Sequence, residues 1–152
     1  MNIEGTRFGT IEYAIEDVVH FDEGLIGFSK WQDYILLSVK PDSPFRWLQS
    51  LTEPALAFLT AIPTAYVESY LPEIDEHLAQ KLGLTETTPT IVLTTATIPA
   101  GSPHEMTLNL AAPIVINAAT RNAKQLVLED PAYTIKHRVF QTANRSGEKQ
   151  AA

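Results

Sequence analysis

The chain has 152 residues, of which 45% are hydrophobic and 19% are charged, the proportions of an ordinary globular protein. Its formal net charge is −7, and the absence of cysteine excludes disulfides and thiolate metal sites. No run of about 18 apolar residues occurs that could form a membrane span. The N-terminal MNIEGTRFGT also lacks the pattern of a secretory signal, so we expect a cytoplasmic protein.

The charge is unevenly distributed along the chain. Residues 1–90 carry fourteen acidic and five basic side chains, whereas residues 91–152 carry four acidic and six basic ones. The stretch between Arg46 and Lys81 contains no base and five acids: Glu53, Glu68, Glu73, Asp75 and Glu76. A field of this sign repels phosphate backbones and attracts basic proteins. We therefore expect no direct nucleic-acid binding, and the acids are either a docking field or an ordinary solvated loop and helix face.

Ten short runs rich in apolar and β-branched residues are predicted as strands, because turn residues separate them. In chain order they span residues 3–8, 10–13, 17–21, 34–40, 45–51, 55–62, 90–98, 105–110, 113–118 and 123–129. The alternation is clearest in the eighth run, where Met106, Leu108 and Leu110 would share one face.

One helix is predicted over residues 73–82. Ile74, Leu78 and Leu82 lie four residues apart, acidic residues precede them, and Gly83 supplies a stop. Closely spaced strands with one helix favour an antiparallel barrel or sandwich. We expect a mostly β, antiparallel barrel-like single domain over residues 1–140 with one short α-helix, and a disordered tail over residues 141–152.

The stretch FDEGLIGF at residues 21–28 has three interpretations. A phosphate-binding loop is disfavoured, because acidic Asp22 and Glu23 precede the glycines and no Lys-Ser/Thr pair follows them. A tight turn with positive φ at Gly24 and Gly27 fits better, with Leu25 and Phe28 packed onto the core. A surface that contacts another protein is the remaining alternative.

Catalytic and metal-binding motifs are missing from the sequence. The four histidines are scattered, and His77 is expected on a solvated helix face. No Gly-x-Ser-x-Gly elbow occurs. A pair of catalytic carboxylates is formed in space rather than in sequence, so an acid-pair hydrolase stays as a third alternative. We expect no catalytic, metal or cofactor site.

Three stretches together resemble the FliW family of flagellar assembly factors, in the family's order and spacing over residues 4–138. They are FDEGLIGF at 21–28, PFRWLQSLTEPALAF at 44–58 and MTLNLAAPIVINAATRNAKQLVLED at 106–130. The third is the most specific, with Asn109, PIVIN at 113–117, Thr120-Arg121 and Lys124-Gln125.

Two positions depart from the family pattern. Ile26 stands where the family usually has proline, and Ala123 stands where it usually has glycine. We expect Ile26 to leave the turn slightly looser, and Asn122 to supply the left-handed backbone conformation in place of the glycine.

The resemblance implies a binding protein rather than an enzyme. Members of the family bind the translational regulator CsrA and antagonise it, and they bind flagellin in a partner switch that controls flagellin synthesis. The first alternative is a cytoplasmic flagellin chaperone without an RNA-regulatory role.

The contact residues are predicted from charge and side-chain type. The acids are expected to attract basic CsrA, and Tyr66, Val67, Tyr70 and Leu71 to line a groove for an amphipathic flagellin helix. Whether Trp47 belongs to the core or to an interface stays open. The candidate protein-binding residues are Trp47, Gln49, Glu53, Glu68, Tyr70, Glu73, Asp75, Glu76, Asn109 and Asn117.

Overall fold

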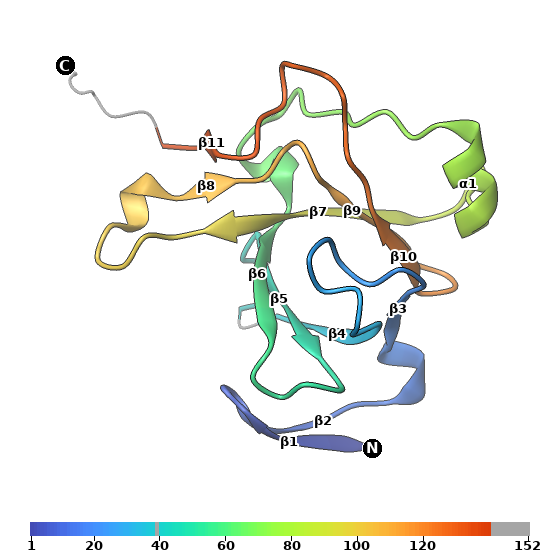
Figure 1. Cartoon of the computed structure of the whole chain (residues 1–152), viewed down its shortest axis with the longest axis vertical. Coiled ribbons are helices and arrows are strands. Elements are labelled where there is room, and N and C mark those ends of the chain that lie inside the picture. Colours follow the sequence, from blue (N-terminus) through green and yellow to red (C-terminus); the bar gives the residue numbers. More distant parts are fainter. Residues whose placement is uncertain (39, 141–152) are drawn as a thin grey trace.

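A closed β-barrel is the centre of the computed structural model, which describes residues 1–38 and 40–140 (Figure 1). In ring order its strands are β7 (Thr90–Thr97), β6 (Ala57–Ala61), β5 (Phe45–Ser50), β4 (Asp33–Leu37), β3 (Val19–Phe21), β10 (Asn122–Gln125) and β9 (Ile114–Asn117). The ring closes because β9 pairs with β7. All neighbours are antiparallel except β3 and β10. The predicted fold class, a mostly antiparallel barrel with one short helix, is confirmed.

The remaining elements attach to the outside of the ring. They are the hairpin of β1 (Asn2–Thr6) and β2 (Gly9–Glu12), the short strands β8 (Thr107–Leu108) and β11 (His137–Arg138), the helix α1 (Glu76–Leu82) and the 3-10 turns η1 (Ile15–Asp17), η2 (Pro63–Ala65) and η3 (Pro103–Glu105). Strands β8 and β11 extend the sheet from the second half of β7. The hairpin and α1 lie at different ends of the molecule (Figure 1).

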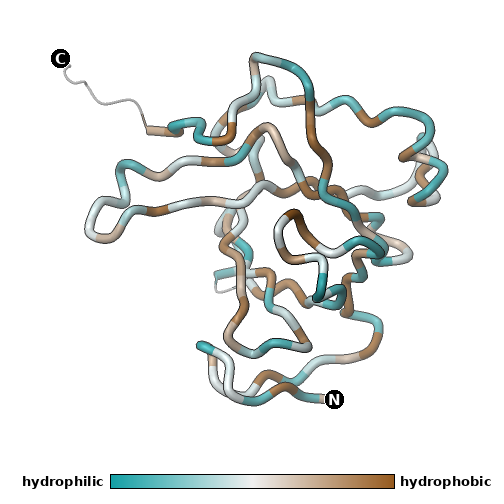
Figure 2. Tube along the Cα trace, in the orientation of Figure 1, coloured by the Kyte–Doolittle hydropathy of each residue, from teal (hydrophilic) through white to brown (hydrophobic). Residues whose placement is uncertain are grey.

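The barrel interior is filled by large apolar side chains from every part of the ring. Phe21 and Tyr34 are fully buried, and their rings meet edge to face at 5.5 Å. Burial raises the pKa of the Tyr34 hydroxyl to about 12. Each such side chain contributes roughly 1.5–3 kcal/mol to folding by leaving water. Several barrel strands carry runs of consecutive apolar residues, such as residues 114–116 of β9, and the chain trace shows such stretches in the apolar colour (Figure 2).

A second apolar cluster confirms the predicted alternation at residues 106–110. Met106, Leu108 and Leu110 are all buried in this cluster. Only Thr107 and Leu108 have strand pairing, however, and η3 occupies the start of the predicted run. The side-chain pattern was therefore a better guide than the strand boundaries.

Helix α1 begins at Glu76, so the predicted start at residue 73 was wrong. Asp75 has an extended backbone, and its carboxylate accepts a hydrogen bond of 2.8 Å from the Leu78 N–H, which makes it the N-cap. The predicted end was right: Gly83 adopts φ +70 and its N–H donates to the last carbonyls. Leu78 and Leu82 pack against Val115 in a third buried cluster.

Several boundaries and one backbone assignment differ from prediction. Strands β4 and β10 end at Leu37 and Gln125, earlier than predicted, and the two-residue β11 was not predicted at all. The left-handed residue beside β10 is Arg121, with φ +69, rather than Asn122. Asn122 is already a strand residue paired with His20, which requires an extended backbone. The predicted tail at residues 141–152 lies outside the described residues, so the domain boundary at 140 stays a prediction.

Candidate functional site

The loop between β3 and β4 lies across the ring of strands, and we call residues 22–28 the plug loop (Figure 1). Gly24 and Gly27 have φ of +65 and +84, which confirms the predicted turn. Leu25 is 2% exposed within the barrel core, and the Phe28 ring meets the Phe58 ring at 5.0 Å. Ile26 points the other way and is 55% exposed. The loop therefore seals the barrel with one face and offers an apolar side chain on the other.

Polar contacts tie the plug loop to the elements beside it. The Glu23 carboxylate pairs with Lys81 of α1 at 3.4 Å and with Lys124 of β10. The hydrogen bond and charge of Lys124, and then those of Lys81, hold the pKa of Glu23 below its usual value. The Ile26 N–H donates to the Gln125 side-chain oxygen at 2.8 Å. These contacts fix the position of the exposed Ile26 relative to β10 and α1.

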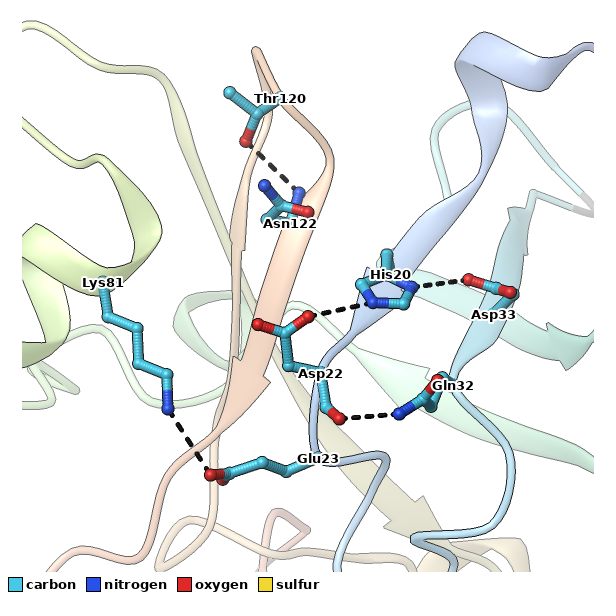
Figure 3. Close-up of polar contacts among 8 residues, drawn as sticks. All are labelled: His20, Asp22, Glu23, Gln32, Asp33, Lys81, Thr120 and Asn122. Atoms are coloured by element: carbon cyan, nitrogen blue, oxygen red, sulfur yellow. Dashed lines mark hydrogen bonds and ion pairs between the residues drawn. The ribbon is translucent and has the colours of Figure 1, made fainter.

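His20 lies between two carboxylates at the base of the same loop (Figure 3). Its Nδ1 is 2.7 Å from Asp33, and its Nε2 is 2.9 Å from Asp22. The hydrogen bond with Asp33 is the largest cause that raises the pKa of His20 above its ordinary value. Gln32 donates a further hydrogen bond to the Asp22 carbonyl at 2.7 Å. This network joins the two ends of the connection between β3 and β4, which contains the plug loop.

Three neighbouring hollows surround the plug loop. The polar hollow, about 230 Å³, is lined by His20, Asp22 and Lys81, among other residues. The apolar groove, about 550 Å³, lies over the first half of β6 and the second half of β7. The acidic hollow, also about 550 Å³, lies between α1 and the segment after β10. Ile26 and Gln125 line all three, so these residues stand at the centre of a continuous contoured surface.

The predicted acidic residues do not form one field. Glu68, Glu73 and Glu76 are exposed on the segment from η2 into α1, whereas Glu53 lies in the β5–β6 turn at the opposite end of the molecule (Figure 1). Asp75 is exposed and also caps α1. The docking field that sequence alone suggested is therefore reduced to residues 68–76.

Three of the predicted contact residues are buried, and their side chains form hydrogen bonds within the fold. The Gln49 amide nitrogen donates to carbonyls on both sides of the β5–β6 turn, and its side chain is 0% exposed. The Asn117 amide nitrogen donates to the Leu82 carbonyl at 2.7 Å, which joins β9 to α1. The Tyr70 hydroxyl donates to the Leu110 carbonyl at 2.7 Å. We assign structural roles to Gln49, Tyr70 and Asn117 and carry none of them into the proposed contact surface.

The other two predicted residues lie closer to the surface. Trp47 is half-buried beneath the β1–β2 turn: the Phe8 ring lies 5.5 Å away, and the Arg7 guanidinium stacks 4.3 Å from the indole ring. Trp47 therefore packs against the N-terminal hairpin and is not free to anchor a partner protein. Asn109 is also half-buried and lines the apolar groove.

Sequence reasoning missed the exposed aliphatic residues of this surface. Ile26, Val127 and Ile135 are 55%, 72% and 66% exposed, and all three line the apolar groove. Val127 was expected within a strand running to residue 129, but β10 ends at Gln125. The sequence did contain one signal. Val127 directly follows Leu126, which is buried, and neighbouring side chains of an extended chain point to opposite faces.

The described residues were compared with the arrangements that hold a metal ion or span a membrane. No group of three or more histidine, cysteine, aspartate or glutamate side chains is arranged to hold a metal ion within residues 1–38 and 40–140. In the same part of the chain, the only α-helix is too short to cross a membrane.

The fold defines a class: a small closed β-barrel whose plug loop is surrounded by three hollows. Comparison with known proteins gives the particular family. The family model for the FliW protein matches residues 2–139. The chain belongs to the FliW family of flagellar assembly factors, which confirms the resemblance inferred from its motifs.

Relatives and a solved structure match most of the chain. Flagellar assembly factor FliW of Magnetococcus marinus is 34% identical over 152 residues, covering 100% of this chain and 93% of the relative. The protein of the same name from Desulfovibrio desulfuricans is 42% identical over 123 residues, covering 80% and 74%. A crystal structure of the flagellar assembly factor FliW has a TM-score of 0.84 at 33% identity, covering 93% of this chain and 98% of that one.

Alanine at the two plug-loop glycines should have unequal effects on stability. A Cβ at Gly24 would lie 2.6 Å from the Ser29 Cα, whereas a Cβ at Gly27 meets nothing within 4 Å. Gly27→Ala therefore adds only backbone strain, about 1 kcal/mol, and Gly24→Ala should destabilise by more than about 2 kcal/mol. Urea unfolding of both variants measures the difference, and equal losses would contradict this account of the turn.

The His20 contacts should make stability depend on pH. Because folding raises the pKa of His20, its stabilising contribution is complete below the ordinary histidine pKa of about 6.5 and is lost as pH rises through the raised value. The effect should be small, since the side chain is 39% exposed. The free energy of unfolding should fall from pH 6 toward pH 8 in the native chain. A His20→Asn variant should show less of this fall, and an identical pH profile would contradict the assignment.

Proposed function

We propose that this chain is a non-catalytic cytoplasmic binding protein that binds CsrA and antagonises it, and that binds flagellin. The two partners exchange in a switch that controls flagellin synthesis. The family assignment supports a role in flagellar assembly, and the resemblance described above is the source of both partners' names.

The observation that carries the proposal is the exposed acidic stretch from Glu68 to Glu76. Glu68, Glu73 and Glu76 have no ion pair within the described residues, so their charges are free to act on a partner. The charge of the whole chain, −7, has the same sign. Such a surface accelerates association with a basic protein and repels RNA. It therefore favours contact with CsrA that is not bound to RNA.

Apolar surface supports the second partner. Leu71, which is 81% exposed, follows the acidic Glu68 and lies in a hollow with Tyr70 and Pro72. Tyr66 and Val67, which were expected to line a flagellin groove, instead pack against the second buried cluster. Any flagellin site in this region therefore depends on Leu71 and on the apolar groove beside the plug loop.

The contacts of the two plug-loop carboxylates argue against their use as the acid pair of the hydrolase alternative. A general acid in glycoside hydrolysis needs a carboxyl group with a raised pKa. Glu23 instead has a lowered pKa because two lysines hold it ionised, and Asp22 is engaged by His20. These two carboxylates have the features of a structural clamp.

Co-purification from the cytoplasm of the source bacterium tests the proposal. Recovery of both CsrA and flagellin with the tagged chain is the expected result. Flagellin without CsrA would favour the chaperone alternative, and recovery of neither protein would contradict the proposed function.

Charge reversal on the acidic stretch should slow CsrA association. The triple variant Glu68→Lys, Glu73→Lys and Glu76→Lys keeps Asp75, because losing that helix cap would cost about 1 kcal/mol. The association rate should fall roughly tenfold or more at low salt, and its dependence on salt should flatten. Stopped-flow kinetics at several ionic strengths measures both effects.

A matched control separates local steering from net charge. Glu4, Glu12 and Glu16 are also exposed, and they lie on the side of the N-terminal hairpin and η1. Reversing these three changes the net charge equally. If both triple variants slow CsrA equally, the acidic stretch is not the docking field.

A further inference from the structure

The first residues of β7 lie beyond the end of β6. The register of β6 with β7 ends at Ala61, the last residue of β6. Pro63, the next residue in line to bond to β7, has no N–H to donate and begins η2. Its carbonyl accepts the N–H groups of Tyr66 and Val67 within the same turn. Among the described residues, 90–92 of β7 therefore have a strand neighbour on one side only, which is β9.

The backbone groups of Thr90 and Val92 point toward this open side. Hydrogen-bonding groups alternate in direction along an antiparallel strand. The Ala118 N–H donates to the Pro89 carbonyl at 2.9 Å, and in the same register the odd-numbered residues at the start of β7 bond to β9. The even-numbered residues face the other side, on which Thr94 pairs with β6. Within the described part of the chain, the backbone N–H and C=O groups of Thr90 and Val92 have no hydrogen-bond partner.

An apolar hollow of about 450 Å³ lies beside this edge, and we call it the Leu71 hollow. It is lined by residues 90–92 and by Tyr70, Leu71 and Pro72 of the segment after η2, among others, and none of the described residues that line it is charged. Leu71 is 81% exposed. Thr90 is exposed and Val92 is half-buried, so a partner can reach the edge. The β7 edge thus combines free backbone donors and acceptors with an uncharged, apolar bed.

Acidic side chains flank one wall of the hollow. Glu68 and Glu73 stand on either side of residues 70–72 in the chain, and both are exposed. Neither forms an ion pair within the described residues, and the sequence contains no base between Arg46 and Lys81. A segment that leaves the hollow therefore meets unneutralised carboxylates, which favour a basic residue at that point.

We propose that an extended segment of a partner protein adds to β7 as a further strand, by hydrogen bonding to Thr90 and Val92. Its uncharged residues occupy the Leu71 hollow, and a lysine or arginine next to them lies near Glu68 or Glu73. The inference rests on the proposed protein-binding function and names a site for it. An extended strand fits better than a helix, because a helix satisfies its own backbone groups and leaves the β7 edge unpaired.

Hydrogen exchange of the free protein provides the first test. The amide of Ile91 bonds to β9 and should exchange slowly, whereas those of Thr90 and Val92 should exchange fast although they lie in the same strand. Slow exchange at Thr90 and Val92 in dilute protein would overturn the proposal. Protection that appears only when the protein alone is concentrated would identify a second copy as the occupant and would also overturn it.

Exchange in the complexes provides the second test, with purified CsrA and purified flagellin as the probes. The proposal expects the amides of Thr90 and Val92 to become protected in at least one complex. If both proteins bind and these amides stay unprotected in each, the β7 edge is not the site, although the proposed function stands. If neither protein binds, the proposed function fails and this inference fails with it.

A matched pair of variants tests the backbone contact. Thr90→Pro removes the N–H that the incoming strand requires, while Thr90→Ala removes only the side chain. Thr90 is the first residue of β7, a position at which a strand accepts proline. For the partner that protects β7, affinity should fall roughly tenfold with Thr90→Pro and stay within about twofold with Thr90→Ala. Equal affinities for the two variants would contradict strand addition.

A second pair tests the hollow without altering β7 or any charge. Leu71→Ser removes the exposed aliphatic side chain from the hollow, and Ile15→Ser removes an exposed aliphatic side chain from η1. Affinity for the same partner should fall roughly tenfold with Leu71→Ser and stay within about twofold with Ile15→Ser. An unchanged affinity of the Leu71→Ser variant would show that the segment does not occupy the hollow.

Discussion

The divided pairing of β7 is the constraint on which the rest of the structure depends. Its first half pairs with β9 and closes the barrel, its middle meets β6, and its end pairs with β8 outside the ring. Only Thr60 and Ala61 of β6 lie in register with β7, and the neighbouring residues of both strands line the apolar groove.

The plug loop connects this architecture to the surface. Leu25 enters the barrel core, and its neighbour Ile26 is held outward by a turn with positive φ at Gly24 and Gly27. The Glu23 clamp and the Gln125 hydrogen bond then fix the loop against α1 and β10. A residue of the barrel core and a residue at the centre of the surface thus share one short loop. Changes in packing beneath Leu25 can alter the position of Ile26.

The sequence predicted those features that depend on local chemistry. The ten strand runs, the stop at Gly83 and the glycine turn follow from alternation and backbone preference, and each has a counterpart in the structure. Family resemblance gave the functional class because its motifs are spread over most of the chain. The start of α1 was misplaced because an acidic residue before a helix can be either a cap or a first-turn residue, and Asp75 is the cap.

The features that depend on contacts distant in sequence could not be predicted. Asn117 is polar, yet it is buried, and its amide donates to the Leu82 carbonyl of a segment far away in the sequence. Glu53 belongs to the same acidic stretch of sequence as Glu73 but lies at the opposite end of the fold (Figure 1). The apolar groove is formed by residues from several elements. In the sequence, its aliphatic residues cannot be distinguished from residues of the core.

The central claim of this account is the exchange of CsrA and flagellin on one small barrel. Exchange requires that occupancy by one partner lowers the affinity for the other, and linkage makes this coupling reciprocal. A titration of CsrA at several fixed flagellin concentrations measures it most directly. The account predicts that the apparent affinity for CsrA weakens by about 5- to 150-fold or more as flagellin approaches saturation. A CsrA affinity that stays constant through saturating flagellin would contradict the switch.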